Sequence, residues 1–324
     1  MNEKIKEEVY KCSKCGLCKS VCPIYLATKN EMYSPRGRHI ILNNFFQNGK
    51  KPSNKFLKSL DVCLNCNLCK DFCPSNIASG KIFTSFKKPS KLLYTKLFFI
   101  FNFSRLFNFY KKYNPKASTK NEKVVYFEGC YNKYIDCTDR NTSIKLIEKL
   151  GYEVEKVISN CCGYTFLSNN DEKLFKKNEE KIIQNCNTTT KYIVCSCDTC
   201  YETLSTITNE EFNKKLIRLD EFLEINNFKI NTNQKTSYFK PLNRKENHNM
   251  QNNTKTVNNK GACSLMENFF AIKYPKLAKE IAKTTNYKTN ENIVTTCNIT
   301  KWGLRELLKQ KVISYSEYIK KEVD

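Results

Sequence analysis

Two stretches decide the N-terminal part of the fold: CSKCGLCKSVCP at residues 12–23 and CLNCNLCKDFCP at residues 63–74. Both follow the pattern C-x2-C-x2-C-x3-C-P, in a chain with 18 cysteines among 324 residues. The chain begins MNEKIKEEVYK, which is charged and lacks the apolar segment of a secretory signal, so we expect a reducing, cytoplasmic compartment and thiolates instead of disulfides. Clustered thiolates in such a compartment predict metal binding.

The spacing of each run favours an iron-sulfur cluster. It matches the run of bacterial two-cluster ferredoxins, in which the fourth cysteine binds the other cluster. We therefore expect two [4Fe-4S] clusters, each with three ligands from one run and one from the other. The alternative is zinc, whose structural sites use four ligands, usually as two pairs. The expected ligands are Cys12, Cys15, Cys18 and Cys73 for the first cluster, and Cys63, Cys66, Cys69 and Cys22 for the second.

The long spacer between the runs is predicted to be helical. RHIILNNFFQ carries apolar residues at helical spacing, and so does SNKFLKSLDVCL. This part of the chain resembles the α-helical ferredoxin module. SPRGRHIIL, residues 34–42, is similar to the segment between the cluster motifs of glycolate oxidase iron-sulfur subunits and their relatives. The alternative for SPRGRHIIL is a plain turn into a helix, punctuated by Pro35 and Gly37.

From residue 123 the pattern changes to alternating strands and helices. Apolar runs at 123–129, 152–158 and 191–196 predict strands, and the segments at 139–151 and 171–186 predict helices between them. A third helix is expected to begin near CYETLSTI. The pattern predicts an α/β fold with a mainly parallel sheet. Five cysteines fall at the carboxyl ends of the predicted strands, the edge where ligands collect in open α/β sheets: Cys130, Cys161, Cys162, Cys197 and Cys200.

The order of these five cysteines resembles the signature of the CCG domain. A cysteine is followed after about thirty residues by CCG, and after about thirty-four more by C-x-x-C. Such domains occur in catalytic subunits of heterodisulfide reductases and in iron-sulfur subunits of glycolate, lactate and anaerobic glycerol-3-phosphate dehydrogenases. In heterodisulfide reductase each complete unit holds a noncubane [4Fe-4S] cluster. The resemblance thus implies that the same five cysteines bind a third cluster, with Gly163 allowing a close backbone approach.

A second CCG unit is expected only in degenerate form. The segments 236–245, 260–282 and 292–307 resemble its parts, but Leu242 and Thr300 stand in cysteine places and there is no doublet. We expect no cluster there, so that Cys263 and Cys297 would share a zinc ion or be ordinary buried thiols. The cysteines that fit no motif are interpreted as structural: Cys137, Cys186 and Cys195.

The expected organisation is a helical ferredoxin-like domain at 1–90, an amphipathic connector at 91–120, a first CCG domain at 121–230 and a degenerate second one at 231–324. Within the connector, KLFFIFNFSRLFNFYKK is the most apolar stretch, but polar residues interrupt it. No apolar run is long enough to span a membrane. We expect this segment to pack on the protein, or alternatively to lie on a membrane surface.

The net charge of +23 favours acidic partners, but no arginine-lysine tract indicates a nucleic-acid arm. The chain has no G-x-G-x-x-G and no P-loop, so we expect no flavin, nicotinamide or ATP on it. Its two histidines, His39 and His248, are interpreted as structural or surface residues. Chemistry on an organic substrate would then belong to another subunit.

The expected function is that of an oxidoreductase component. As an iron-sulfur subunit, the chain would take electrons from a flavoprotein that oxidises glycolate, lactate or a similar 2-hydroxy acid. It would pass them to a quinone or another acceptor, in the cytoplasm or at the cytoplasmic face of the membrane. Two alternatives remain: a disulfide reductase with catalysis at the CCG cluster, and a docking module whose CCG site holds a structural metal.

Overall fold

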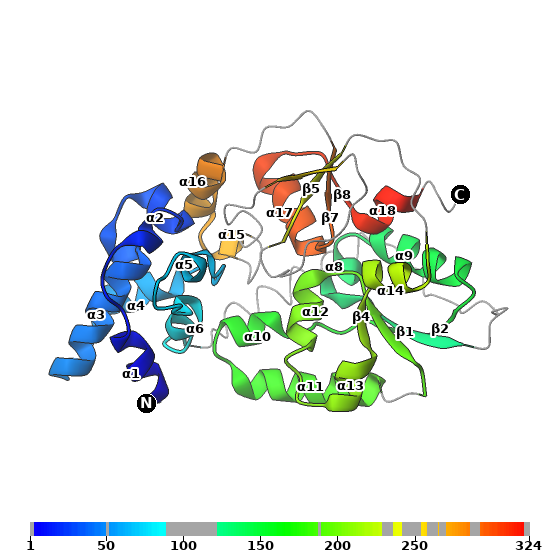
Figure 1. Cartoon of the computed structure of the whole chain (residues 1–324), viewed down its shortest axis with the longest axis horizontal. Helices are drawn as coiled ribbons and strands as arrows, with labels where there is room; N and C mark the ends of the chain where they lie inside the picture. Colours follow the sequence, from blue (N-terminus) through cyan, green and yellow to red (C-terminus); the bar gives the residue numbers. More distant parts are fainter. Residues whose placement is uncertain are drawn as a thin grey trace.

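The computed structural model describes residues 3–49, 52–88, 122–186, 189–228, 236–241, 254–257, 265, 270–285 and 292–320. They form three units: a helical unit (3–88), a first α/β unit (122–228) and a second α/β unit (236–320). Figure 1 shows the helical unit at the left and the two sheets at the right, the second above the first. The predicted connector at 91–120 lies outside the described residues. None of the described helices is long and apolar enough to cross a membrane.

The helical unit confirms the predicted helical spacer. Its elements are α1 (Glu3–Tyr10), η1 (Leu17–Lys19), α2 (Pro23–Thr28), η2 (Glu31–Tyr33), α3 (Pro35–Asn48), α4 (Asn54–Asp61), α5 (Leu68–Asp71) and α6 (Ser79–Thr84). Helix α3 begins at Pro35, where the Ser34 hydroxyl accepts the Gly37 N–H at 2.9 Å. A Cβ on Gly37 would lie 2.1 Å from the carbonyl oxygen of Glu31. Gly37 therefore does more than punctuate a turn, because it lets η2 and α3 touch.

The first α/β unit confirms the three predicted strands and the helices that follow them. Its strands are β1 (Lys123–Phe127), β2 (Glu153–Ile158), β3 (Tyr192–Cys195) and β4 (Leu216–Arg218), and they pair in the order β2-β1-β3-β4, all parallel. Its helices are α8 (Gly129–Tyr134), α9 (Thr138–Lys149), α10 (Tyr164–Ser168), α11 (Glu172–Cys186), α12 (Asp198–Leu204), α13 (Glu210–Lys215) and α14 (Leu219–Ile225). Strand β1 lies inside this sheet and is buried from Val124 to Phe127, as its unbroken apolar run predicts.

The second α/β unit repeats the topology of the first. Its strands are β5 (Thr236–Phe239), β6 (Thr254–Val257), β7 (Asn292–Thr295) and β8 (Val312–Ser314). They are also all parallel and pair in the order β6-β5-β7-β8, so the first strand of each unit lies between the second and the third. The helices described in this unit are α15 (Phe270–Lys273), α16 (Pro275–Thr285), α17 (Asn298–Leu308) and α18 (Tyr315–Ile319). The repeated strand order agrees with an internal duplication of one α/β unit.

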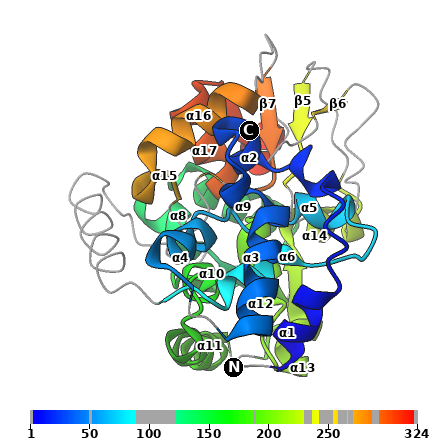
Figure 2. The same cartoon turned by 90° about the vertical axis from the view of Figure 1, so that its left-hand side faces the viewer.

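Apolar clusters join the three units. Val124 and Phe222 of the first α/β unit pack in one cluster with Val294 and Ile319 of the second. Helix α2 of the helical unit packs on α16, and the two helices share another buried cluster (Figures 1 and 2). Lys273 adds polar contacts at this junction, since its ammonium group lies 3.8 Å from an Asp61 carboxylate oxygen and donates to the Asn169 side chain at 2.9 Å. The second α/β unit thus packs on both other units, and the Asn170 side chain of the first α/β unit also donates directly to the Ser85 carbonyl oxygen of the helical unit at 3.2 Å.

Candidate metal centres

Two cavities in the helical unit are lined by the cysteines of the two runs. Each contains the first three cysteines of one run and the last cysteine of the other, and Cys69 borders both. The first cavity is lined by Cys12, Cys15, Cys18 and Cys73, and the second by Cys63, Cys66, Cys69 and Cys22. The folded chain therefore brings together the two sets of four thiols that the sequence predicts as cluster ligands.

The two runs wind in the same way because equivalent residues take left-handed conformations. In the first run these are Lys14 (φ 60°) and Gly16 (φ 88°), and in the second Asn65 (φ 55°) and Asn67 (φ 57°). Glycine and asparagine tolerate this region better than other residues do. The left-handed residues flank the second cysteine of each run, so each loop curls around its cavity.

The last cysteine of the first run leaves the loop in an extended conformation. Cys22 has φ −73° and ψ 112°, and Pro23 after it opens helix α2. A residue before proline avoids the helical region, and proline is preferred at the first position of a helix. The C-P ending of the run therefore turns Cys22 away from its own loop and toward the second cavity.

The five cysteines after the strands meet at one edge of the first α/β unit. Cys130 lies in α8, the doublet Cys161–Cys162 precedes α10, and Cys197 and Cys200 lie at the start of α12. Thiol–thiol hydrogen bonds join Cys130 to Cys161, Cys161 to Cys162, Cys162 to Cys200, and Cys200 to Cys197. The topology thus gathers residues seventy positions apart into one continuous group of thiols.

Burial and mutual hydrogen bonding set the charge of these thiols. Hydrogen bonds from Cys130 and Cys162 hold the pKa of Cys161 well below its usual value. Hydrogen bonds from the Cys200 and Cys297 thiols do the same for the pKa of Cys197. In the helical unit, burial raises the pKa of Cys18 to about 11, so metal binding there must displace its proton.

Comparison with known proteins identifies two domains. Residues 8–77 match the 4Fe-4S dicluster domain, and residues 124–205 match the cysteine-rich domain known as CCG. The chain joins a 4Fe-4S dicluster domain to a CCG domain. The dicluster domain contains both cysteine runs, and the CCG domain contains the five thiols of the sheet edge.

Two curated proteins are similar to part of the chain. The probable glycolate oxidase iron-sulfur subunit of Bacillus subtilis (strain 168) is 33% identical over 76 residues, which cover 23% of this chain and 17% of the relative. The glycolate oxidase iron-sulfur subunit of Escherichia coli (strain K12) is 35% identical over 66 residues, which cover 20% of this chain and 16% of the relative. Each match thus spans about a sixth of the relative's length. No solved structure matches the chain.

A buried cation in the dicluster domain supports an anionic group in the second cavity. Arg38 is only 1% exposed and borders this cavity. Its guanidinium lies 5.3 Å from the centre of the Phe83 ring, and neither Nε nor Nη2 has a hydrogen-bond partner among the described residues. A buried, unpaired charge is costly. Thiolates bound to an iron-sulfur cluster would supply the missing negative charge.

Two glycines shape the CCG site. A Cβ on Gly129 would lie 3.1 Å from the sulfur of Cys200, and one on Gly163 would lie 2.8 Å from the Phe175 ring. Both glycines have positive φ, at 72° and 94°. Gly129 therefore leaves space beside the Cys200 thiol, and Gly163 lets the Phe175 ring pack against the backbone next to the cysteine doublet. Within the part of the chain that the structure describes, no three His, Cys, Asp or Glu side chains are grouped to hold a single metal ion.

The structure adds Arg38 to the residues that the sequence singles out, and it places Cys297, which the sequence assigns only to a degenerate unit, beside Cys197. The only sequence signal for Cys297 is the parallel between VCSCDTC at 194–200 and VTTCNIT at 294–300, and nothing in RGRH predicts an unpaired Arg38. His39 is buried, and its Nε2 lies 3.0 Å from the Ser79 hydroxyl. Burial, helped by the Arg38 charge, lowers the pKa of His39 to about 4, so it is neutral and structural at pH 7.

The remaining cysteines are located as follows. Cys186 and Cys195 lie in the same apolar cluster as Cys162, Cys197 and Cys200, and the Cys195 thiol donates to the Cys197 carbonyl oxygen at 3.5 Å. Cys137 is half-buried at the start of α9. Cys263 lies outside the described residues, as do Leu242 and His248.

Proposed function

We propose that the chain is an iron-sulfur electron-transfer subunit of a flavin-dependent oxidoreductase for glycolate, lactate or a similar 2-hydroxy acid. The observation that carries this proposal is the distribution of the eight cysteines of the two runs over two cavities of one small unit. Bound [4Fe-4S] clusters supply one-electron chemistry at such sites. The partial similarity to glycolate oxidase iron-sulfur subunits supports a 2-hydroxy-acid oxidase as the enzyme served.

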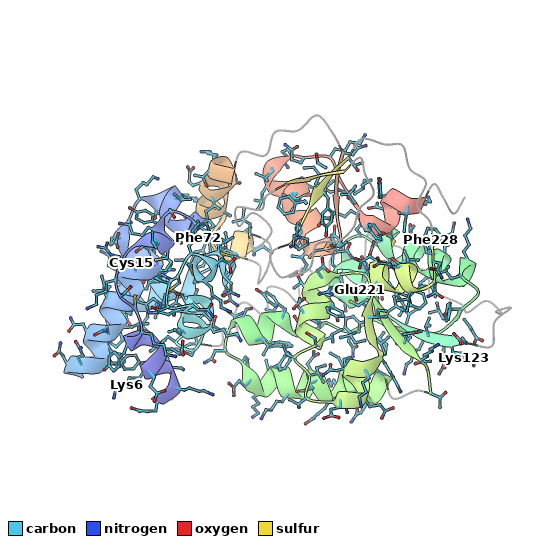
Figure 3. All side chains as sticks on the ribbon, in the orientation of Figure 1. Lys6, Cys15, Phe72, Lys123, Glu221 and Phe228 are labelled. Atoms are coloured by element: carbon cyan, nitrogen blue, oxygen red, sulfur yellow. The ribbon has the colours of Figure 1, made fainter. Side chains whose placement is uncertain are left out.

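The surface around the first cavity favours it as the contact with a redox partner. Cys15 is exposed, and Leu17 and Phe72 beside it are each more than half exposed; Figure 3 shows Cys15 and Phe72 on the helical unit. Exposed apolar side chains around a partly open site are typical of a contact surface. The second cavity lies deeper, because Cys22 packs in the apolar cluster shared with α16. The first set of thiols would therefore face a flavoprotein, and the second would face the interior.

The third centre belongs to the same proposal. Cys130, Cys161, Cys162, Cys197 and Cys200 would hold a noncubane [4Fe-4S] cluster in the CCG domain. The burial of Cys162, Cys197 and Cys200, the continuous contacts among the five thiols and the space that Gly129 leaves beside Cys200 support this assignment. The final acceptor would be a quinone or another oxidant.

Reduction of the clusters by substrate tests this function. The tagged chain is purified anaerobically from its native cells, bound flavin is measured, and glycolate, D-lactate or L-lactate is added while EPR spectra are recorded. We expect a copurified flavoprotein and a reduced [4Fe-4S] signal with at least one of these acids. If dithionite reduces the clusters but no 2-hydroxy acid does so in the flavin-containing preparation, the proposed function is wrong.

A disulfide reductase is the second candidate, and one observation favours it. Cys130 and Cys161 are partly exposed whereas Cys162, Cys197 and Cys200 are buried, so one side of the CCG site reaches solvent. A disulfide could approach from that side. Under this alternative, dithionite-reduced protein is reoxidised by an organic disulfide such as oxidised coenzyme M, and Cys161→Ser abolishes the reoxidation.

A further inference from the structure

The two α/β units meet at equivalent turns. Cys197 precedes α12 and Cys297 precedes α17, and their backbones are nearly identical, with φ/ψ of −124°/117° and −123°/116°. Each cysteine follows the third strand of its unit by two residues. The turns are in direct contact, because the backbone N–H of Asp198 donates to the carbonyl oxygen of Thr296 at 3.2 Å. The duplication therefore places two corresponding cysteines face to face.

The distance between these two cysteines suits a shared metal atom. Their sulfurs are 3.9 Å apart, and Cys297 is fully buried. Two thiolates bound at about 2.3 Å to one tetrahedral metal are separated by about 3.8 Å. The separation of the two sulfurs therefore already matches that of two ligands on one metal atom.

Cys297 lies in the same apolar cluster as Cys186, but its sulfur also has polar neighbours. Its sulfur lies 3.2 Å from the Thr199 hydroxyl, in addition to its contact with Cys197. Thr300, which occupies the place of the second cysteine of C-x-x-C, is fully buried, and its hydroxyl has no hydrogen-bond partner among the residues that the structure describes. A buried hydroxyl without a partner is unfavourable. Thr300 lies one turn after Cys297 on α17, so an anionic centre bound at Cys297 would provide a nearby acceptor.

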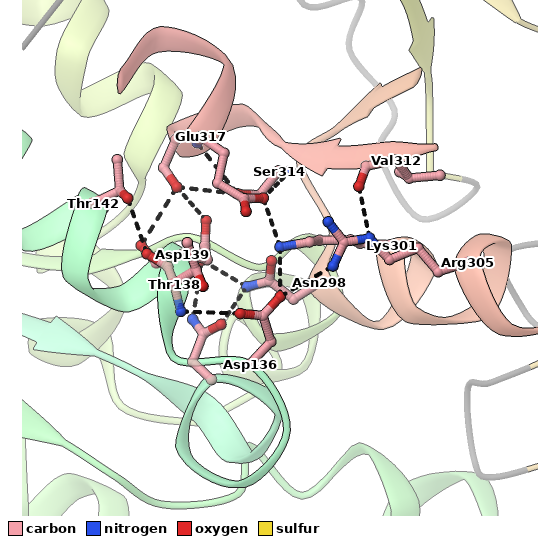
Figure 4. A network of polar contacts seen from close by, with 12 residues as sticks. Asp136, Thr138, Asp139, Thr142, Asn298, Lys301, Arg305, Val312, Ser314 and Glu317 are labelled. Carbon is pink, nitrogen blue, oxygen red and sulfur yellow. Dashed lines mark hydrogen bonds and ion pairs between the residues drawn. The ribbon is translucent and has the colours of Figure 1, made fainter. Parts of the chain in front are cut away.

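Polar contacts hold α17 in this position (Figure 4). The Asn298 side chain, next to Cys297, donates to the buried Asp139 carboxylate at 2.8 Å. Lys301, one turn further, forms ion pairs with Asp136 of the first α/β unit at 2.8 Å and with Glu317 of the second at 2.6 Å. These contacts fix the start of α17 against the first unit, so the Cys297 sulfur is held in place before any metal binds.

We propose that Cys297 is a further protein ligand of the metal centre in the CCG domain. The centre would then be bound by six thiolates, five from the first α/β unit and one from the second. This inference rests on the proposed third cluster. It gives the degenerate unit a specific role, because that unit would complete a site in its neighbour without holding a cluster of its own.

Matched serine variants test the proposal. Cys297→Ser is compared with Cys186→Ser, another buried cysteine, and with Cys197→Ser, a predicted ligand. Iron and acid-labile sulfide are measured in each anaerobic protein, and EPR spectra are recorded over a range of potentials. We expect Cys297→Ser to lose the iron of the CCG centre or to shift its g-values, as Cys197→Ser does, with both cubane signals unchanged. Cys186→Ser should match the wild type.

The outcomes separate this proposal from the proposed function. An unchanged CCG signal with full iron content in Cys297→Ser overturns the additional ligand and leaves the third cluster standing. A wild-type protein that shows only two cubane signals overturns both the additional ligand and the third cluster. Should the variant fail to fold, anomalous diffraction at the iron edge from wild-type crystals decides. An iron peak within about 2.5 Å of the Cys297 sulfur supports the ligand, and iron bound only by the other five sulfurs refutes it.

Discussion

Lys301→Met probes the junction between the two α/β units. The Lys301 side chain is 0% exposed and forms ion pairs with Asp136 and Glu317, which are themselves largely buried. Methionine has a similar length and is apolar, so the change removes the charge without leaving a large cavity. Removing one partner of a buried ion pair typically costs about 3–5 kcal/mol. Arg305 still pairs with Asp136 at 3.3 Å, so we expect the free energy of unfolding to fall by about 3 kcal/mol, the lower end of this range.

The assay is urea unfolding of anaerobically purified protein, followed by circular dichroism. With a urea dependence of about 3 kcal/mol per M, the expected loss lowers the midpoint of the transition of the α/β units by about 1 M. The matched control is Lys309→Met at the end of the same helix, where the ion pair with Glu306 is 3.9 Å long and exposed. Exposed pairs contribute about 0–1 kcal/mol. Equal midpoints for the two variants would refute the role of Lys301 at this junction.

Three further predictions concern the sites themselves. Arg38→Gln removes the unpaired buried charge at the second cavity, so the reduction potential of the cluster proposed there should fall by on the order of 100 mV in an EPR-monitored titration. The control Lys58→Gln, at an exposed position, should leave this potential unchanged. Gly163→Ala combines left-handed strain with a clash at the Phe175 ring, so it should lower the free energy of unfolding by about 2–5 kcal/mol and abolish the EPR signal of the CCG centre. Gly49→Ala, where a Cβ meets nothing within 4 Å, should lower the free energy of unfolding by only about 1–2 kcal/mol. An equal loss at both positions would contradict the clash. Phe72→Ser should slow cluster reduction by the proposed flavoprotein partner severalfold with unchanged iron content, and an unchanged rate would remove this surface from the proposed contact.

The sequence predicts the local elements well, because they depend on short-range patterns, and it names the sets of thiols that the fold then brings together. The C-x2-C-x2-C-x3-C-P runs define their own loops, and the strands around Val124 and Val194 are continuous apolar runs that have few alternatives. The contact of Cys297 with Cys197 joins residues one hundred positions apart. It depends on how two sheets pack, which no local pattern specifies. The unpaired charge of Arg38 could not be predicted from the sequence either, because it follows only from the packing around the side chain.

Metal analysis of the anaerobically purified chain tests the central claim most directly. Two cubanes predict about eight iron atoms per chain and a third cluster raises the number to about twelve, with matching acid-labile sulfide and two distinct cubane EPR signals after reduction. Cys73→Ser should disturb the same cubane as Cys12→Ser, because the two residues line one cavity. About four iron atoms or fewer, or stoichiometric zinc, would contradict the assignment of the chain as an iron-sulfur electron-transfer subunit.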